Sequence, residues 1–330
     1  MIVSDNSPSK KILSLDAGAS KIRLVVFDEF GHTLGSMVKN PGANISINPE
    51  ESSKKIIKSI SDLLDSLSLG YDDINHYSLG IAGISDDKGR DMLFKRLDDK
   101  QISSITHLSS DVNPIFEINC SDDSAILVSV GTGFICLGRN QEGKIIKAGG
   151  KGLELDAGSG YWIGKELILN LSFSRDMEQD ENEFSELLDM TLKHYQTTEL
   201  NNVLDGIMDS DDKYSTIASV SKPLIGLAKK ENQIALSIVQ QSTQHVAEHI
   251  LTLADQISYL NDDLIIIANG GVLEDSFYRQ SLEDALSFDF ENINWLFPSI
   301  STAYYPGLLS CKLIGININV EHLLKHNPIV

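Results

Sequence analysis

The sequence predicts a two-lobed, doubly wound α/β fold, and three observations carry this prediction. Apolar strand patterns alternate with amphipathic helix patterns along most of the chain. A plan of strand, small-residue turn, strand, turn and third strand occurs twice, over residues 11–38 and again over residues 124–150. The length of 330 residues is sufficient for two domains that each bury a core of their own.

The first half of the chain begins with three predicted strands, over residues 11–14, 22–27 and 32–38. The stretch NPEESSKKIIKSISDLLDSL has an acidic first turn and apolar residues at helical spacing, which predicts a helix. A short buried strand at YSLGIAG and a helix over residues 92–97 follow. Because the pattern restarts at residues 118–123, we assign residues 1–118 to an N-terminal lobe and 119–330 to a C-terminal lobe. The last helix is free to pack back on the N-terminal lobe.

After the repeated plan, the second half reads as mainly helical, including residues 161–171 and the amphipathic stretch 231–260. One late strand, LIIIANGGV, interrupts the helices and ends in Gly270 and Gly271. This strand completes the α/β pattern of the second lobe.

Composition excludes several classes of function. The formal net charge of -20 repels polyanions, so neither nucleic acid nor an anionic membrane is an expected partner. The three cysteines are far apart and form no CxxC pair, which argues against a disulfide framework, a zinc ribbon or a cysteine-ligated cluster. The first residues have no apolar signal core and no run is long enough to span a membrane, so we expect a cytoplasmic protein.

Two short motifs have alternative interpretations. The run GRNQEGK has most of the P-loop spacing, but Ile145 stands where the magnesium-binding Ser or Thr is required, so a hairpin turn is favoured. The run HVAEH can place two histidines on one helical face as zinc ligands. Because the apolar stripe of that helix runs through Val246 and Ile250, a solvated histidine pair is favoured there.

The turn DAGASK, from Asp16 to Lys21, favours phosphate binding. Its small side chains leave the backbone N–H groups open to a crowded, charged group, and Ser20 and Lys21 can add a hydroxyl and a cation. Asp16, at the end of the first strand, would hold Mg²⁺, mostly through water. The alternative is an ordinary tight hairpin that begins with an Asp.

The second turn, Gly131 to Gly133, occupies the matching place in the repeated plan. Two such hairpins facing each other would hold a nucleoside triphosphate between the lobes. The paired glycines of NGGV, Gly270 and Gly271, would lie flat against an adenine.

The motifs DAGASK, PGAN, SLGIAG, SSD, VGTG, GGKGLELDAGSGYWIG and IANGGV follow one another between residues 12 and 315. In this order they resemble the N-acetylglucosamine and glucosamine kinases of the BadF/BadG/BcrA/BcrD ATPase group, in the superfamily of acetate and sugar kinases, Hsp70 and actin. The resemblance implies an α/β fold of two similar ribonuclease H-like (actin-like ATPase) lobes with a cleft between them.

The resemblance also implies roles for individual residues. Asp111 would be the catalytic base, and Asp16 the magnesium residue. The nucleotide would be held by the two phosphate loops and the adenosine motif, at Gly18, Ala19, Ser20, Lys21, Gly131, Thr132, Gly133, Gly270 and Gly271. The sugar would be held by Asn44, Gly149, Gly150 and Asp156. A carboxylate that takes the proton of a sugar hydroxyl, with Mg²⁺ and N–H donors on the phosphates, is the chemistry that phosphoryl transfer needs.

Three departures from the family pattern leave the exact sugar open. Alanines and Ser20 replace glycines and Thr in the first loop, Phe134 replaces a Ser after the second, and Ala157 replaces an acid in the sugar block. The leading hypothesis is ATP-dependent phosphorylation of N-acetylglucosamine to its 6-phosphate. The alternatives are a glucosamine kinase, an ATPase that activates a partner enzyme, and an inactive sugar or nucleotide sensor. For Asp111, the alternative is a cap on a helix that begins near Pro114. Whether the chain forms a homodimer is also open.

Overall fold

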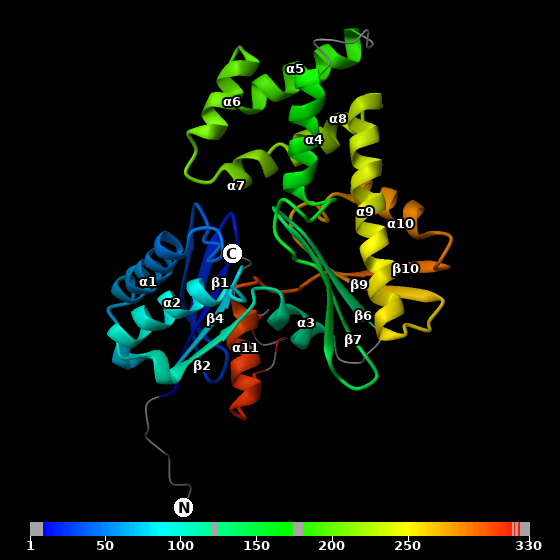
Figure 1. Cartoon of the computed structure of the whole chain (residues 1–330). Coiled ribbons are helices and arrows are strands. Elements are labelled where there is room, and N and C mark those ends of the chain that lie inside the picture. The colour runs from blue at the N-terminus through cyan, green and yellow to red at the C-terminus, as the bar shows by residue number, and fades with distance from the viewer. Residues whose placement is uncertain (1–8, 121–124, 174–180, 319, 321–322, 324–330) are drawn as a thin grey trace, which may run out of the picture. The chain divides into compact units, whose positions relative to one another are not determined.

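The computed structural model describes residues 9–120, 125–173, 181–318, 320 and 323. It divides into two compact units: unit 1 contains residues 1–121 and 298–330, and unit 2 contains residues 122–297 (Figure 1). Each unit has its own hydrophobic core, built on its own five-stranded sheet.

The sheet of unit 1 has the strand order β3-β2-β1-β4-β5. Its strands are β1 (Lys11–Ala17), β2 (Ile22–Asp28), β3 (Thr33–Lys39), β4 (His76–Ile81) and β5 (Thr106–Ser109). The first three strands pair antiparallel, whereas β1, β4 and β5 are parallel. Because parallel strands carry functional groups at their carboxyl ends, the ends of β1, β4 and β5 are the place to look for a site.

The helices of unit 1 are α1 (Pro49–Ser66), α2 (Asp87–Asp99), α3 (Asn113–Asn119) and α11 (Tyr304–Leu313), with short 3₁₀ turns η1 (Tyr71–Asp73) and η2 (Ser103–Ile105). The side chain of Asn48 caps α1 by accepting the N–H of Glu51, and Pro49 follows at the first helical position. Helix α11 returns to β1, where the N–H of Gly307 donates to Ser14 Oγ at 2.7 Å. This helix is thereby part of unit 1.

Unit 2 repeats this sheet. Its order is β10-β9-β6-β7-β8, with β6 (Ala125–Val130), β7 (Phe134–Arg139), β8 (Ile145–Gly149), β9 (Asp263–Asn269) and β10 (Asn292–Leu296). Strands β6, β7 and β8 pair antiparallel, and β6, β9 and β10 are parallel. The two units therefore have the same topology, which confirms the two-lobed α/β prediction.

The helices of unit 2 are α4 (Gly160–Phe173), α5 (Glu181–His194), α6 (Leu200–Met208), α7 (Lys213–Ala218), α8 (Ser221–Ala228), α9 (Gln233–Ile257) and α10 (Ser276–Leu286). Helices α5, α6 and α7 lie beyond α4, away from the sheet of this unit (Figure 1). The side chain of Asn232 caps the start of helix α9. The helix terminates before Ser258, whose φ of 54° is left-handed.

Strand β10 contradicts the sequence interpretation. The interpretation of the second half as helical after residue 271 is wrong at β10, whose residues alternate between exposed and half-buried on an edge strand. The run GRNQEGK forms the tight β7–β8 turn, in which the N–H of Asn140 donates to the carbonyl of Lys144, so the hairpin interpretation is confirmed. Among the described residues, no helix is long and apolar enough to cross a membrane.

Candidate active site

The hairpin between β1 and β2 brings the predicted phosphate loop into a compact turn. The N–H of Gly18 donates to the carbonyl of Lys21 at 3.0 Å, and the side chains of Ser20 and Lys21 are exposed. Asp16 precedes the turn, is 6% exposed, and pairs across the hairpin with Arg23. The turn therefore places a buried carboxylate directly beneath a loop of small residues.

A second segment, PGAN (residues 41–44), packs against the backbone of this hairpin. The N–H of Ala43 donates to the carbonyl of Gly18 at 2.9 Å. A Cβ atom added at Gly42 would lie 2.5 Å from both Ala19 O and Lys21 N, so only glycine lets the two backbones meet there. Sequence reasoning did not single out Gly42, because nothing local shows which backbone it touches.

Asn44, in the same segment, has one end of its amide engaged and the other available. Its Oδ1 accepts from the N–H of Ser46 at 3.1 Å and from the Ser46 hydroxyl at 2.8 Å. Within the described part of the chain, its Nδ2 group has no partner. The half-buried amide is therefore oriented and still has two donors for a ligand.

Asp111 lies close to Asp16 because of the sheet register. Asp16 pairs with Gly80 on β4, Gly80 pairs with Ser109 on β5, and Asp111 follows two residues later. A Cβ atom at Gly80 would lie 3.4 Å from the Cα of Asp111. A glycine at this position therefore leaves room for the backbone of Asp111. Two acids at the ends of parallel strands thus flank one glycine.

The pKa of Asp111 is raised from 3.8 to about 7. Burial is the main cause and the nearby charge of Asp16 adds to it, while N–H groups of Asp111 and Val112 act in the opposite direction. Burial also raises the pKa of Asp16, against the hydroxyl of Thr302 and the guanidinium of Arg23. A carboxyl group that titrates near pH 7 is suited to proton transfer.

The alternative role of Asp111 as a helix cap is not what the structure shows. Helix α3 begins after Val112 without a side-chain cap, and the N–H of Asn113 donates to Ser110 Oγ at 3.1 Å. The Asp111 carboxylate instead faces the N–H groups that precede the helix.

Asp16 has two partners that sequence reasoning missed. The hydroxyl of Thr302, which is 286 residues away, donates to Asp16 Oδ2, and Arg23 Nη1 lies 3.5 Å from the same oxygen. Arg23 could have been found by counting back from the hairpin tip, but no local pattern points to Thr302. Oδ1 has no partner among the described residues, so it is available to water or a cation.

The residues around Asp16 fit Mg²⁺. Magnesium is usually held by one or two carboxylates, with water and substrate phosphates completing its shell. The free Oδ1 of Asp16 and the neighbouring Asp111 supply that kind of donor set. Within the described residues, no group of three or more His, Cys, Asp or Glu side chains could hold a metal ion by itself.

In unit 2, the second predicted turn meets the predicted adenosine motif. The turn is closed by a hydrogen bond from Gly131 N to Gly133 O at 2.9 Å. Gly270 has a φ of +90°, and a Cβ atom on it would lie 2.9 Å from Gly131 N. The N–H of Val272 also donates to the carbonyl of Val130 at 3.1 Å. Two segments far apart in sequence therefore form one backbone surface.

The start of α4 completes this surface. Its Gly160 and Tyr161 N–H groups donate to Gly131 O and Thr132 O, at 2.8 and 3.1 Å. A Cβ atom at Gly131 would meet nothing within 4 Å, so the outer side of the turn is open. Lys222, on α8, lies across Gly271 and forms an ion pair with Glu274 at 2.8 Å.

The predicted sugar block follows β8 and packs against Phe134. Gly149 and Gly150 have positive φ values of 73° and 64°, and Gly150 N donates to Phe134 O at 2.9 Å. A Cβ atom at Gly149 would lie 2.6 Å from the Phe134 ring. Phe134, the residue that replaces the usual Ser, is thus a buried support for the two glycines.

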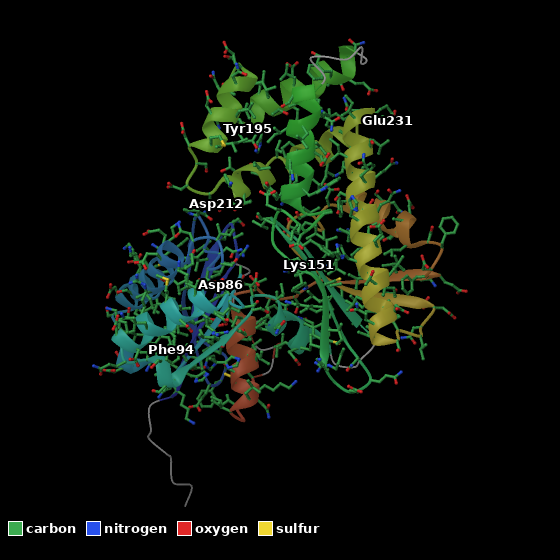
Figure 2. All side chains as sticks on the ribbon, viewed as in Figure 1. Asp86, Phe94, Lys151, Tyr195, Asp212 and Glu231 are labelled. Atoms are coloured by element: carbon green, nitrogen blue, oxygen red, sulfur yellow. The ribbon has the colours of Figure 1, made fainter. Side chains whose placement is uncertain are left out.

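Asp156 is 4% exposed and holds its own loop. Its two carboxylate oxygens accept the N–H groups of Lys151 at 2.9 Å and Gly152 at 3.3 Å (Lys151 is labelled in Figure 2). Burial raises its pKa, and these N–H groups and His249 oppose the rise. The side chain is therefore a loop anchor in this structure, with lone pairs left over for a ligand.

The two histidines of HVAEH pack against aromatic rings. His249 stacks on Phe134 with ring centres 5.0 Å apart, and His245 meets Trp162 edge-on at 5.2 Å. Both rings are half-buried, so the prediction of a solvated pair is wrong. Aromatic packing from α4 and β7, distant in sequence, explains the difference.

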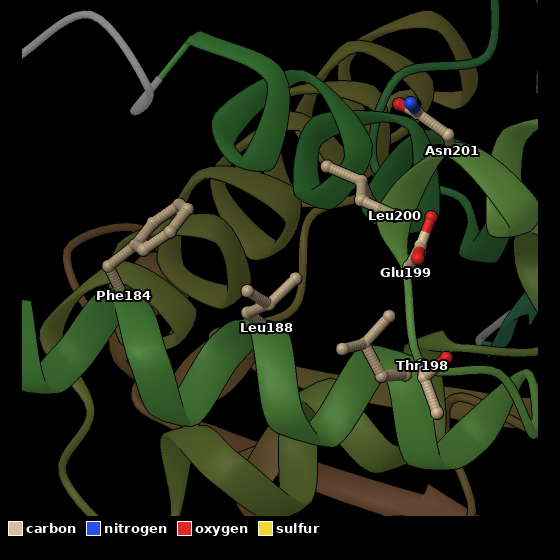
Figure 3. A pocket seen from close by; sticks show the side chains of 7 residues that line it. Phe184, Leu188, Thr198, Glu199, Leu200 and Asn201 are labelled. Carbon is tan, nitrogen blue, oxygen red and sulfur yellow. The ribbon is translucent and has the colours of Figure 1, made fainter.

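A separate pocket lies among the helices of unit 2. It has a volume of about 280 Å³ and is lined mainly by α5 and the segment before α6, including Phe184, Leu188 and Glu199 (Figure 3). None of the predicted site residues lines it.

Comparison with known proteins places these features in a family. A curated relative from Clostridium acetobutylicum, named N-acetylmuramic acid/N-acetylglucosamine kinase, is 24% identical over 278 residues, which is 82% of this chain and 87% of the relative. The solved structure of a protein from Chromobacterium violaceum, provisionally named an N-acetylglucosamine kinase, has a TM-score of 0.70 at 16% identity over 91% of this chain and 99% of that one.

A second provisionally named N-acetylglucosamine kinase, from Porphyromonas gingivalis, has a TM-score of 0.65 at 17% identity and covers 93% of this chain and 100% of its own. These structures share the fold. The family model for BadF/BadG/BcrA/BcrD ATPases matches residues 13–302, which include the hairpins of both units and Thr302. The chain therefore belongs to the BadF/BadG/BcrA/BcrD ATPase family.

Proposed function

We propose that this protein transfers the terminal phosphoryl group of ATP to a hydroxyl of an amino sugar, with the 6-hydroxyl of N-acetylglucosamine as the leading acceptor. The observation that carries the proposal is the pair of acids on either side of Gly80, the buried Asp16 at the end of β1 and the half-buried Asp111 after β5, of which Asp111 has a pKa of about 7. One acid available for proton transfer beside one suited to a cation is what a sugar kinase requires.

Asp111 acts as the general base in this proposal. Its carboxylate takes the proton of the sugar hydroxyl while the hydroxyl oxygen forms a bond to phosphorus, and the bond from phosphorus to the bridging oxygen breaks to release ADP. Asn44 donates its free Nδ2 hydrogens to a sugar hydroxyl. Asp156, Gly149 and Gly150 contribute sugar contacts from unit 2.

The nucleotide is assigned to residues of both units. The turn Gly18–Lys21 donates N–H groups, a hydroxyl and an ammonium to phosphate, and the turn Gly131–Gly133 donates N–H groups from its open side. Gly270 and Gly271 receive the adenosine. When bound, Mg²⁺ supplies positive charge that disperses the charge of the phosphates, and Asp16 is the residue that would hold it, largely through water.

The names of the relatives support an amino sugar as acceptor but leave its identity open. The curated relative is named for both N-acetylmuramic acid and N-acetylglucosamine. A solved structure from Listeria monocytogenes, with a TM-score of 0.56, is provisionally named an N-acetylmannosamine kinase. The panel of acceptors should therefore include all three sugars and glucosamine.

The experiment is a coupled assay of ADP release across that panel, with the Asp111→Asn variant as control. We expect release that depends on one or two of the sugars and that the variant abolishes. ADP release without any sugar would instead favour an ATPase that acts on a partner, and binding without release would favour a sensor. Either result would overturn the kinase proposal.

A further inference from the structure

Arg23 carries a charge next to Asp16, a buried acid of unit 1. Residues Asp16 and Arg23 are direct cross-strand partners at the end of the β1–β2 hairpin, so their side chains lie on the same face of the sheet. Arg23 Nη1 is 3.5 Å from Asp16 Oδ2. The carboxylate side chain is 9% exposed and the arginine side chain 33% exposed.

Most of the hydrogen-bonding capacity of Arg23 is unused. A guanidinium has five N–H donors in a rigid fork. Across the described residues, Asp16 is the sole partner that Arg23 has. Arg96 of the same unit is different, because its Nε donates to Ser53 and its Nη2 to Glu50, at 2.9 and 2.5 Å. Arg96 is thus engaged at both ends of its fork, whereas Arg23 keeps several donors free.

These donors belong to a residue that closely follows the turn proposed to bind phosphate. Arg23 is two residues after Lys21, the last residue of that turn, and its neighbour Asp16 would repel a polyphosphate if it were unpaired. A guanidinium at this point both neutralises the acid and offers a planar fork, which matches phosphate oxygens.

The fold itself does not require a charged pair here. The equivalent cross-strand pair on the repeated hairpin of unit 2 is Ser129 with Ile135, one residue before the last pair of each hairpin. That hairpin folds with the same topology without an ion pair between these two positions. The Arg23–Asp16 pair is therefore a property of the site, not of the hairpin.

We propose that Arg23 is a phosphate-binding residue, which donates from its free N–H groups to a phosphate oxygen of ATP in addition to pairing with Asp16. The inference rests on the ATP site of the proposed function and not on the identity of the sugar.

The test is a double-mutant cycle on ATP affinity, made from the wild type, Arg23→Gln, Asp16→Asn and the double variant. The measurement uses displacement of trinitrophenyl-ATP in EDTA, so that no metal bound at Asp16 contributes. Charge-assisted hydrogen bonds of this kind lead us to expect that Arg23→Gln weakens ATP binding by roughly tenfold or more. The loss should appear both in the wild-type background and in the Asp16→Asn background.

The Asp16→Asn background separates the two roles of Arg23. If Arg23 only neutralised Asp16, its replacement would weaken ATP binding when Asp16 is charged and have no effect once a neutral asparagine replaces that acid; such a result would overturn the proposal. The double variant leaves no unpaired buried charge, so the comparison holds even where Arg23→Gln alone folds poorly.

Two controls complete the experiment. Arg96→Gln removes the same charge from the same unit and should leave ATP affinity unchanged within about twofold, because surface charges at a distance are screened by salt. Arg23→Lys keeps the charge but loses the fork and should give an intermediate affinity. Because no sugar is present, failure of the sugar-kinase proposal would leave this result intact.

Discussion

The two hairpins that begin the two units share a backbone plan but carry different chemistry. In unit 1 the pair before the tip is Asp16 with Arg23, and in unit 2 it is Ser129 with Ile135. The parallel neighbour is Gly80 in unit 1 and Asn269 in unit 2, whose amide donates to Ser129 Oγ at 2.9 Å. Charge in one hairpin is thus replaced by a neutral hydrogen bond in the other.

This difference shows what the repeated topology supplies and what the side chains add. In both units, a turn of small residues follows the strand whose carboxyl end lies beside a parallel neighbour. Unit 1 adds two acids at that end, the buried Asp16 and the half-buried Asp111. We infer that unit 1 supplies the proton acceptor and the metal residue, while unit 2 supplies a largely neutral backbone surface for the nucleotide.

The largest effect is expected at Asp111. The variant Asp111→Asn keeps the shape of the side chain but cannot accept a proton, so we expect turnover to fall roughly 100-fold or more. Calorimetry should show sugar and ATP binding nearly unchanged, because the base acts in the chemical step.

The matched variant in unit 2 is Asp156→Asn, whose carboxylate holds the N–H groups of its own loop. We expect it to raise the KM for the sugar more than it lowers turnover. Normal turnover in Asp111→Asn would contradict the inference that unit 1 supplies the proton acceptor.

A second effect is expected on the backbone surface of unit 2. Gly270 has a φ of +90°, and a Cβ atom on it would collide with the carbonyl of Val130. We expect Gly270→Ala to destabilise the protein by about 1–3 kcal/mol and to weaken nucleotide binding. The matched change is Gly143→Ala in the β7–β8 turn, where φ is +79° but a Cβ atom meets nothing within 4 Å.

Melting curves of the two glycine variants, with and without ADP, separate two effects. Gly143→Ala introduces backbone strain alone, whereas Gly270→Ala introduces backbone strain and a steric collision. Equal melting temperatures and equal stabilisation by ADP would show that Gly270 has no special place in the nucleotide surface.

The smallest effect concerns pH and stability. Folding raises the pKa of Asp111 from 3.8 to about 7 in the metal-free protein, so the folded state holds this proton more tightly than the unfolded state. The resulting stabilisation is complete below about pH 4 and is lost as the pH rises through 7. Asp111→Asn cannot lose a proton, so its melting temperature should exceed that of the wild type by more at pH 8 than at pH 5. A difference that stays constant between these pH values would contradict the raised pKa.

Much of the fold could be predicted because the signals are local. The strands of both hairpins, the helix that begins at Pro49 and the late strand before Gly270 all show their period and their turn residues in the sequence. Strand β10 was missed although Asn292–Leu296 alternates polar and apolar residues, because a run of this length was read as part of the helices around it.

The site could be predicted only in part, for the same reason. Small-residue turns and an acid at a strand end are visible in the sequence, so Asp16 and the glycines were found. Thr302 and Gly42 act through contacts that form only when distant segments meet, so the partners of these residues cannot be read from the sequence around them. The aromatic packing of His249 on Phe134 depends likewise on two elements that are far apart in the chain.

The most direct test of the difference between the units is Mn²⁺ binding in the presence of ADP, followed by electron paramagnetic resonance, for Asp16→Asn and Ser129→Ala. The two residues hold equivalent positions in their hairpins. We expect Asp16→Asn to weaken Mn²⁺ binding by roughly tenfold or more, because it removes a charged oxygen donor for the ion, and Ser129→Ala to leave it unchanged. Unchanged Mn²⁺ affinity in Asp16→Asn, or an equal loss in both variants, would contradict the assignment of the metal residue to unit 1.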